Sequence, residues 1–276
     1  PTQNINLRLS YSSGFRAPQA FDEDMHIENV GGTVAMIERT KNLKEEKSQS
    51  FSASADIYHR FGAFQTNFLI EGFYTKLTDV FVLGEPYNRG DGVLVKLRSN
   101  GPGAKVMGLT LEGKVAYLSI LQIQAGLTLQ RSRYDEPHKW HDDVPAKRTI
   151  FRTPNVYGYF TATYIPIKPL SIALSGTYTG SMFVQRMDIT AENAAMGDMP
   201  ERKAEAVKTP KFLDLGVKLA YDFKLYKTVD LQLSGGVQNI LEAYQKDFDR
   251  GANRDSGYIY GPALPRSFFA GVKISY

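Results

Sequence analysis

The sequence predicts an all-β protein whose antiparallel strands form part of a transmembrane β-barrel. Three observations predict this class: apolar and polar residues alternate in about ten segments, tyrosines recur at the segment ends, and short and long connections alternate between them. The chain contains no run of about 18 consecutive apolar residues, so it offers no candidate for a membrane-spanning helix. Only strands arranged as a barrel could cross a bilayer under that condition.

Each alternating segment is expected to be one strand, because successive side chains of a strand leave opposite faces. The clearest segment is 121–130, in which leucine, isoleucine and alanine alternate with glutamine, glycine and threonine. Most segments approach the length of about 9–11 residues that a tilted strand needs to cross a bilayer. In chain order, the strands are predicted in segments 5–11, 51–57, 64–74, 109–117, 121–130, 156–164, 170–179, 213–221, 229–238 and 268–276.

Tyrosines lie at the ends of these segments, on the apolar face. Amphipathic rings at both ends of the strands are typical of the two membrane–water interfaces of a barrel. In a soluble sandwich the apolar face would be covered by a second sheet, and this placement would have no purpose. The predicted interface residues are Tyr11, Tyr74 and Tyr178 at one end, and Tyr117, Tyr164, Tyr221 and Tyr276 at the other.

The connections between the segments differ at the two ends. Short links at 60–63, 118–120, 165–169 and 222–228 are expected to be periplasmic turns. Long polar links are expected to lie outside the cell, with a short turn at 85–92 as the exception. These long links are 13–43, 135–152, 185–210 and 244–263. Within the third one, residues 190–207 are rich in alanine, glutamate and lysine, which favours a short helix.

Composition excludes several functional classes. Cysteine is absent, which removes disulfides, thiolate metal sites and cysteine nucleophiles. The net charge of +4 is small for this length, so no nucleic-acid partner is expected. The four histidines stand in no nucleophile or zinc-protease motif, so we expect neither an enzyme nor a cofactor. Histidines and carboxylates cluster in 135–143, but a solvated loop explains them better than a metal site.

Four short motifs resemble those of TonB-dependent outer-membrane receptors. Residues 239–242 (Asn-Ile-Leu-Glu) resemble the turn that ends the penultimate strand in this family, and 264–266 (Leu-Pro-Arg) resemble the step that opens the last strand, with Leu-Pro in place of Pro-Gly. Near the start, 11–18 (Tyr-Ser-Ser-Gly-Phe-Arg-Ala-Pro) resemble a strand-end signature of the family. Residues 43–48 (Leu-Lys-Glu-Glu-Lys-Ser) resemble the opening of its next strand, without the usual proline.

The resemblance implies a barrel of about 22 strands, filled by a plug, in the outer membrane of a Gram-negative bacterium. Residues 1–276 would then be the C-terminal part of the barrel domain, without the plug and the first strands. The implied function is TonB-dependent import of a scarce nutrient, and we expect a ferric siderophore or a similar chelate. The implied partners are the protein's own plug domain, the TonB complex and outer-membrane lipid.

The long loops are the part of this chain that could contact such a ligand. The expected contacts are Arg16, His138, Trp140, Tyr244 and Tyr258, and no metal ligand is expected. Two alternatives remain open. One is a passive porin or small complete barrel, which the many small inward residues oppose because a ten-stranded barrel needs bulky filling. The other is a soluble β-sandwich that binds carbohydrate, which the positions of the tyrosines oppose.

Overall fold

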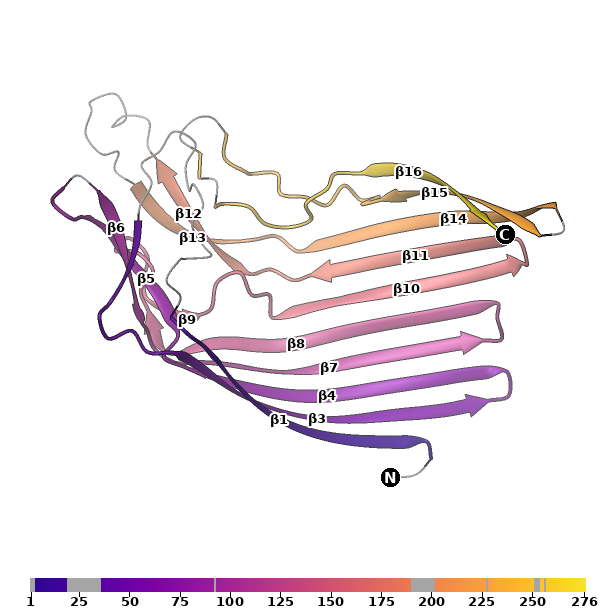
Figure 1. Ribbon diagram of the computed structural model, residues 1–276, viewed down its shortest axis with the longest axis horizontal. Helices are drawn as coiled ribbons and strands as arrows, with labels where there is room; N and C mark the ends of the chain where they lie inside the picture. The colour runs from indigo at the N-terminus through magenta and orange to yellow at the C-terminus, as the bar shows by residue number, and fades with distance from the viewer. Residues whose placement is uncertain are drawn as a thin grey trace.

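The computed structural model describes residues 3–18, 36–91, 93–189, 202–226, 228–250, 254–255 and 257–276. Their regular secondary structure consists of strands alone. Ten strands form one continuous antiparallel sheet in the order β1-β3-β4-β7-β8-β10-β11-β14-β15-β16, and the short strand β9 lies beside β8 (Figure 1). All ten alternating segments of the sequence lie in this sheet, so the prediction of an antiparallel all-β fold with about ten strands is confirmed.

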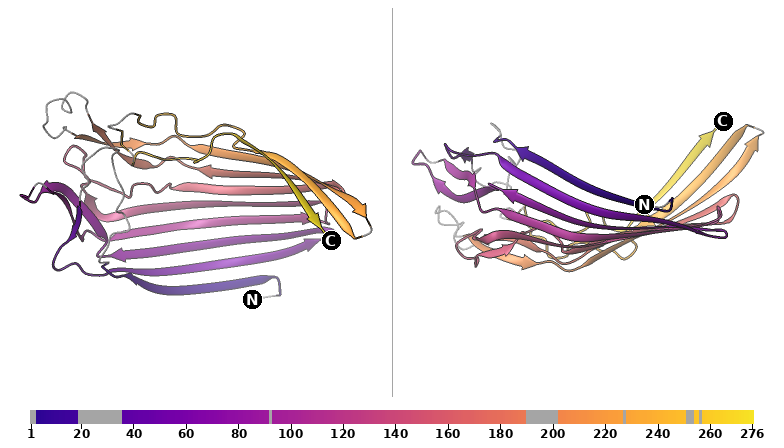
Figure 2. Two further views of the ribbon diagram at one scale, coloured as in Figure 1. Left: turned by 45° about the horizontal axis from the view of Figure 1, so that its top comes forward. Right: turned by 90° about the horizontal axis from the view of Figure 1, so that it is seen from below.

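The strands of this sheet, which we call the wall, have the following bounds. They are β1 (Ile5–Arg16), β3 (Glu46–Phe61), β4 (Phe64–Thr78), β7 (Ala104–Tyr117), β8 (Leu121–His138), β10 (Val156–Ile167), β11 (Leu170–Thr179), β14 (Phe212–Tyr226), β15 (Val229–Gln238) and β16 (Ser267–Ser275), with β9 at Lys147–Thr149. The wall curves like part of a barrel but does not close, since β1 and β16 form its two edges (Figure 2). No helix of the described residues could span a membrane.

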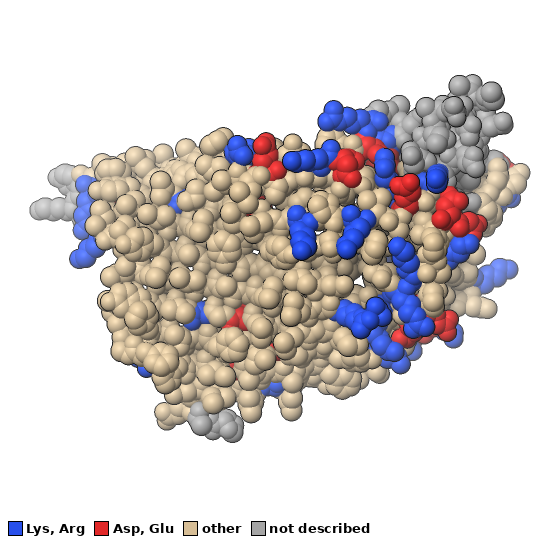
Figure 3. Space-filling model, turned by 180° about the vertical axis from the view of Figure 1, so that it is seen from behind, with Lys and Arg blue, Asp and Glu red and all other residues tan. Residues whose placement is uncertain are grey.

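Burial in the wall is the reverse of that in a soluble sheet. On β8, the apolar side chains of Ile123, Leu127 and Leu129 are exposed, whereas Thr128 and Ser132 on the other face are buried. Seen from behind, the surface of the wall is almost free of charge, and the charged side chains gather toward the loop end (Figure 3). An extended exposed apolar face of this kind suits contact with lipid.

Register places the predicted interface tyrosines in rows across the wall. At the loop end, Tyr11 and Tyr74 are both paired with Phe51 on β3. At the opposite end, Tyr117 and Tyr164 are both paired with Leu121 on β8. In the pairing of β11 with β14, Tyr178 pairs with Leu213 near one end and Tyr221 pairs with Leu170 at the other. Tyr276 directly follows β16. Their role at the membrane interface stays a prediction.

The long connections carry strands of their own, which the sequence did not predict. A three-stranded sheet in the order β2-β6-β5 contains β2 (Met36–Arg39), β5 (Phe81–Asn88) and β6 (Leu94–Asn100), and a separate hairpin pairs β12 (Phe183–Ile189) with β13 (Arg202–Lys208). Residues 85–88 of the turn expected at 85–92 therefore belong to β5 of this small sheet. The wall strands β4 and β7 are joined by a long connection.

The helix expected at 190–207 is wrong for residues 202–207, which belong to β13; residues 190–201 lie outside the described part of the chain. The physical reason is tertiary pairing. Seven residues of β13 pair with seven of β12, and these cross-strand contacts outweigh the weak helix preference of alanine, glutamate and lysine.

Candidate functional site

A cavity of about 670 Å³ lies at the loop end of the wall. Its lining comes from β1, β5, β6, the end of β8 with the loop that follows, β9, β12, Asp255 and Gly257, so segments far apart in the sequence meet there. The volume is in the range of small-molecule binding pockets. This cavity is the candidate site.

The lining of the cavity is rich in positive charge. Among the residues that the structure describes, five cationic side chains line it, with one carboxylate, that of Asp255. The cationic residues are Arg16, Lys96, Arg98, Lys147 and Arg152. A concave surface with charges mostly of one sign concentrates the electrostatic field, so this cavity attracts anions.

Aromatic rings form a second part of the lining. The ring of Trp140 lies 6.2 Å from that of Phe151 in an edge-to-face arrangement. Phe151 in turn lies 6.4 Å from Phe183, which is not itself part of the lining. The ammonium group of Lys147 sits 4.1 Å from the centre of the Phe183 ring. Burial lowers the pKa of His138, which keeps its imidazole neutral at pH 7. Flat apolar surfaces and cations thus stand side by side in one cavity.

The hairpin of β5 and β6 is fixed to the wall by polar contacts at its base. The side-chain amide of Asn100 donates hydrogen bonds to the carbonyl oxygens of Lys44 (3.0 Å) and Asp79 (2.8 Å), and its oxygen accepts one from the amide of Lys44 (2.8 Å). The amide of Phe81 donates to the carboxylate of Glu46 on β3 at 2.9 Å. Because of these contacts, Phe81, Lys96 and Arg98 are held in place over the cavity.

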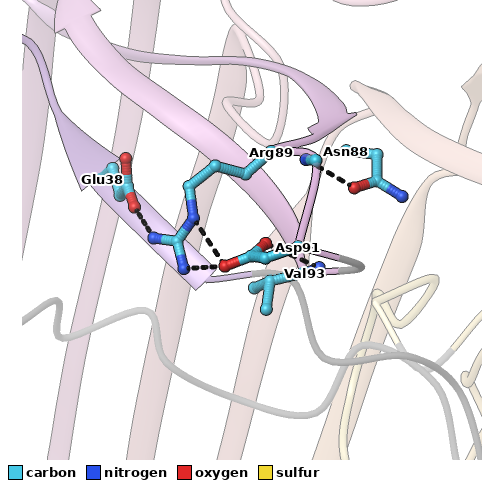
Figure 4. A network of polar contacts seen from close by, with 6 residues as sticks. Glu38, Asn88, Arg89, Asp91 and Val93 are labelled. Carbon is cyan, nitrogen blue, oxygen red and sulfur yellow. Dashed lines mark hydrogen bonds and ion pairs between the residues drawn. The ribbon is translucent and has the colours of Figure 1, made fainter.

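At its far end the same hairpin is joined to β2. The guanidinium of Arg89 donates hydrogen bonds to Glu38 at 2.5 Å and to Asp91 at 2.6 Å (Figure 4). The hydrogen bond from Arg89 holds the pKa of Asp91 below its usual value. Since these groups are exposed, we regard the network as an ordering contact between loops and assign it little stability.

The loop between β15 and β16 closes the cavity from another side. Tyr258 and Tyr260 of this loop form a buried cluster with Val184 of β12 and Phe212 of β14. Arg152 donates hydrogen bonds to the carbonyl oxygens of Ile259 (2.9 Å) and Gly257, and so ties this loop to the segment before β10.

A carboxylate anchors the two tyrosines of this cluster. The hydroxyls of Tyr258 (2.7 Å) and Tyr260 both donate to Asp247. Burial alone would raise the pKa of Asp247, but the hydrogen bonds from Tyr260 and Tyr258 outweigh it and hold that pKa below its usual value. Burial and the hydrogen bond to Asp247 raise the pKa of Tyr258 to about 12. The carboxylate therefore stays charged and the phenols stay neutral over the physiological range.

The structure brings three of the five expected contact residues together. Arg16 at the end of β1, His138 at the end of β8 and Trp140 in the loop that follows all line the cavity. Tyr244 is half-buried and does not line the cavity. Tyr258 is 1% exposed and its hydroxyl is bound to Asp247, so its side chain supports the loop. That these residues contact a ligand stays a prediction.

Lys96, Arg98 and Lys147 line the cavity but were not expected from the sequence. Lys96 and Arg98 are two residues apart on β6 and therefore share one face of that strand. That spacing is the signal that could have identified them. Across the described ranges of the chain, no group of three or more histidines, aspartates or glutamates is placed to hold a metal ion.

A family model described as TonB dependent receptor-like, beta-barrel, matches residues 1–240. Among solved structures, the FrpB iron transporter from Neisseria meningitidis (F3-3 variant) is 17% identical, with a TM-score of 0.60, over 100% of this chain and 37% of that one. The siderophore receptor PirA from Acinetobacter baumannii is 14% identical, with a TM-score of 0.63, over 99% of this chain and 39% of that one.

A third similar structure is a mutant of the ferric enterobactin receptor PfeA from Pseudomonas aeruginosa. It is 15% identical, with a TM-score of 0.60, over 99% of this chain and 38% of that one. The chain thus spans somewhat more than a third of the length of these structures, and at such identities the likeness concerns the fold. No curated protein matches the sequence.

Proposed function

Because this chain belongs to the family of TonB-dependent receptors, we propose that it forms the C-terminal part of the barrel wall of a receptor that imports a ferric siderophore or a similar anionic chelate. Members of this family are outer-membrane β-barrels of Gram-negative bacteria. In the proposed receptor a plug domain fills the barrel, and the TonB complex supplies the energy for active transport. The chelated iron is cargo and needs no resident metal site.

The observation that carries this proposal is the combination of five cationic side chains and four aromatic rings around one cavity at the loop end. Ferric chelates carry negatively charged oxygens on bulky, partly flat ligands. Guanidinium and ammonium groups bind such oxygens through charge-assisted hydrogen bonds, and rings such as Trp140 and Phe151 offer flat apolar surface. The similar structures named above include an iron transporter, a siderophore receptor and a ferric enterobactin receptor, which agrees with this choice of ligand.

Growth of a deletion strain on single iron sources tests the function. The strain is complemented either with the wild-type receptor or with the double variant Lys96→Gln/Lys147→Gln, and uptake of the ⁵⁵Fe-loaded chelate is measured. We expect the variant to bind and take up the chelate at least tenfold less well below saturation, since one charge-assisted hydrogen bond contributes about 1.5–3 kcal/mol. Lys168→Gln/Lys224→Gln, which removes two cations at the short-turn end, is the matched control.

Two outcomes would contradict the proposal. Growth without defect on every iron source tested would exclude iron uptake. Uptake that persists after the proton-motive force is collapsed with an uncoupler would instead favour a passive porin. Ligand entry can be followed separately by comparing the fluorescence of the wild type with that of Trp140→Phe, because the difference isolates the emission of Trp140.

A further inference from the structure

The outer face of the wall carries a cationic pocket next to an apolar groove. The pocket has a volume of about 200 Å³ and is lined by Lys105, Arg131, Arg133, Arg148 and Asp135, together with Met107 and Tyr134. The groove has a volume of about 780 Å³ and is lined by β1, β3, β4 and β7. Met107 lines both, so the two adjoin at this residue.

Register shows that both features lie on the apolar, outward face. Tyr11, Phe51, Tyr74, Met107 and Arg131 form one row of paired positions across five strands. The row two residues nearer the loops contains Lys76, Lys105 and Arg133. Two residues along a strand return to the same face about 7 Å farther on. Cationic side chains therefore stand directly above the aromatic row, and Figure 3 shows Lys and Arg side chains gathered on this face toward the loops.

The groove exists because small residues interrupt the apolar face. Gly72 pairs with Ala53 on one side and with Leu109 on the other. A side chain at Gly72 would meet no atom within 4 Å, so the space above it is open. The surface around this gap is formed by Leu9, Tyr11, Phe51, Tyr74 and Met107. Such a gap can take a hydrocarbon chain without movement of its walls.

The guanidinium groups of the pocket have little internal compensation. Lys105 forms an ion pair with Asp135 at 2.8 Å. Within the part of the chain that the structure describes, the exposed side chains of Arg131, Arg133 and Arg148 form no ion pair or hydrogen bond with a protein group. Several like charges in one small pocket repel one another, and an anion with several oxygens relieves this repulsion.

From this geometry we propose that the outer wall holds a phosphorylated lipid, with its phosphate in the cationic pocket and one acyl chain in the groove beside Gly72. Charge complementarity selects the phosphate, and the apolar groove that adjoins the pocket at Met107 selects a lipid over a free anion. None of the cations of this pocket lines the cavity for the chelate, although Tyr134 lines both. Lipid binding can therefore hold even where the growth test on iron sources fails.

The test uses the protein purified as its gene encodes it, in a neutral detergent. The probe is lipid A, a disaccharide with two phosphates and several acyl chains, and binding is measured by native mass spectrometry. We expect Arg131→Gln/Arg133→Gln/Arg148→Gln to weaken binding at least tenfold. Arg60→Gln/Lys168→Gln/Lys224→Gln, which removes three cations at the short-turn end, should leave binding within twofold of the wild type.

A second variant tests the groove without any change of charge. Gly72→Leu should fill the gap and weaken binding several-fold. Gly113→Leu is its control, since a side chain at Gly113 also meets no atom within 4 Å and Gly113 pairs with Phe68 on the same outward face but outside the groove. Because Gly72→Leu keeps every cation, it decides the matter even where the triple variant does not fold.

Three results would overturn the proposal. The first is unchanged affinity for lipid A in the triple arginine variant. The second is unchanged affinity in Gly72→Leu. The third is inorganic pyrophosphate that binds the wild type as tightly as lipid A does, because that would reduce the site to an anion pocket in which the groove has no part.

Discussion

The side-chain amide of Asn239 donates a hydrogen bond of 2.8 Å to the carbonyl oxygen of Leu264, 25 residues farther along the chain. The same amide donates to the carbonyl oxygen of Ala243 at 3.1 Å, and its oxygen accepts from the Ala243 amide at 2.7 Å. Arg266 donates to the carbonyl oxygen of Ile240 at 3.0 Å. The turn after β15 and the step before β16 are therefore one hydrogen-bonded unit, which aligns the last two strands.

Replacement of Asn239 should destabilise this corner of the wall. Asn239 is 1% exposed and its φ is 49°, a left-handed conformation that asparagine tolerates better than most residues. We expect Asn239→Gly, which keeps the backbone freedom but removes the three hydrogen bonds, to lower the free energy of unfolding by about 2–3 kcal/mol. Asn239→Ala should cost about 1 kcal/mol more, because alanine is strained at this φ.

Denaturant unfolding in micelles measures both effects. Glu242→Gly is the control. Glu242 also has a positive φ, of 54°, but it is exposed, so its replacement should lower the stability of the protein little. Equal stability of Asn239→Gly and the wild type would show that the hydrogen bonds contribute nothing.

The hydroxyl of Tyr258 stabilises the loop between β15 and β16 through Asp247. Tyr258→Phe removes one hydrogen bond to a charged group and leaves the packing of the ring intact, so we expect a local loss of about 1.5–3 kcal/mol. Hydrogen exchange of the Tyr260 amide, which donates to the buried side chain of Gln245 at 3.1 Å, reports this loss. Tyr244→Phe is the matched control and should leave that exchange unchanged. If the Tyr260 amide exchanged at the same rate in both variants, the hydrogen bond from Tyr258 to Asp247 would not stabilise the loop.

Acid should loosen the same loop. The hydrogen bonds from Tyr260 and Tyr258 outweigh burial and lower the pKa of Asp247 from its ordinary 3.8, so its stabilising contribution is complete above that pH and is lost as the pH falls through the lower, folded value. We expect protection of the Tyr260 amide, corrected for intrinsic exchange, to be constant near neutral pH and to fall below pH 3.8. In Asp247→Asn this acid-dependent step should disappear; its persistence there would assign it to another group.

The wall was predictable because its signal is local. Alternation along segments such as 121–130 fixes which face each side chain takes, and lipid on one side preserves a strict apolar pattern. The motif that contains Asn239 was recognisable for a related reason. A left-handed turn with three hydrogen bonds to one side chain accepts few residues other than asparagine.

The cavity was only partly predictable because it is made by long-range contacts. Arg16, His138 and Trp140 were expected as polar or aromatic loop residues, whereas Lys96 reaches the cavity through a hairpin whose short strands carry no strong alternation. Tyr258 has a partner that the sequence did not reveal. An aromatic residue in a polar loop suggests a ligand contact, but its carboxylate partner at Asp247, 11 residues away, cannot be inferred from spacing alone.

We expect that position 176 must be glycine, because its cross-strand neighbour leaves no room for a side chain. Gly176 on β11 pairs with Phe160 on β10, and a side chain at Gly176 would overlap the ring of Phe160. Gly176→Val should therefore lower the free energy of unfolding by about 1–3 kcal/mol. At Gly72→Val, where no atom lies within 4 Å, the loss should be much smaller. In the background of Phe160→Ala the ring is absent, so Gly176→Val should cost little more than Phe160→Ala alone. A full additional loss in that background would show that backbone strain, and not the ring of Phe160, excludes a side chain at this position.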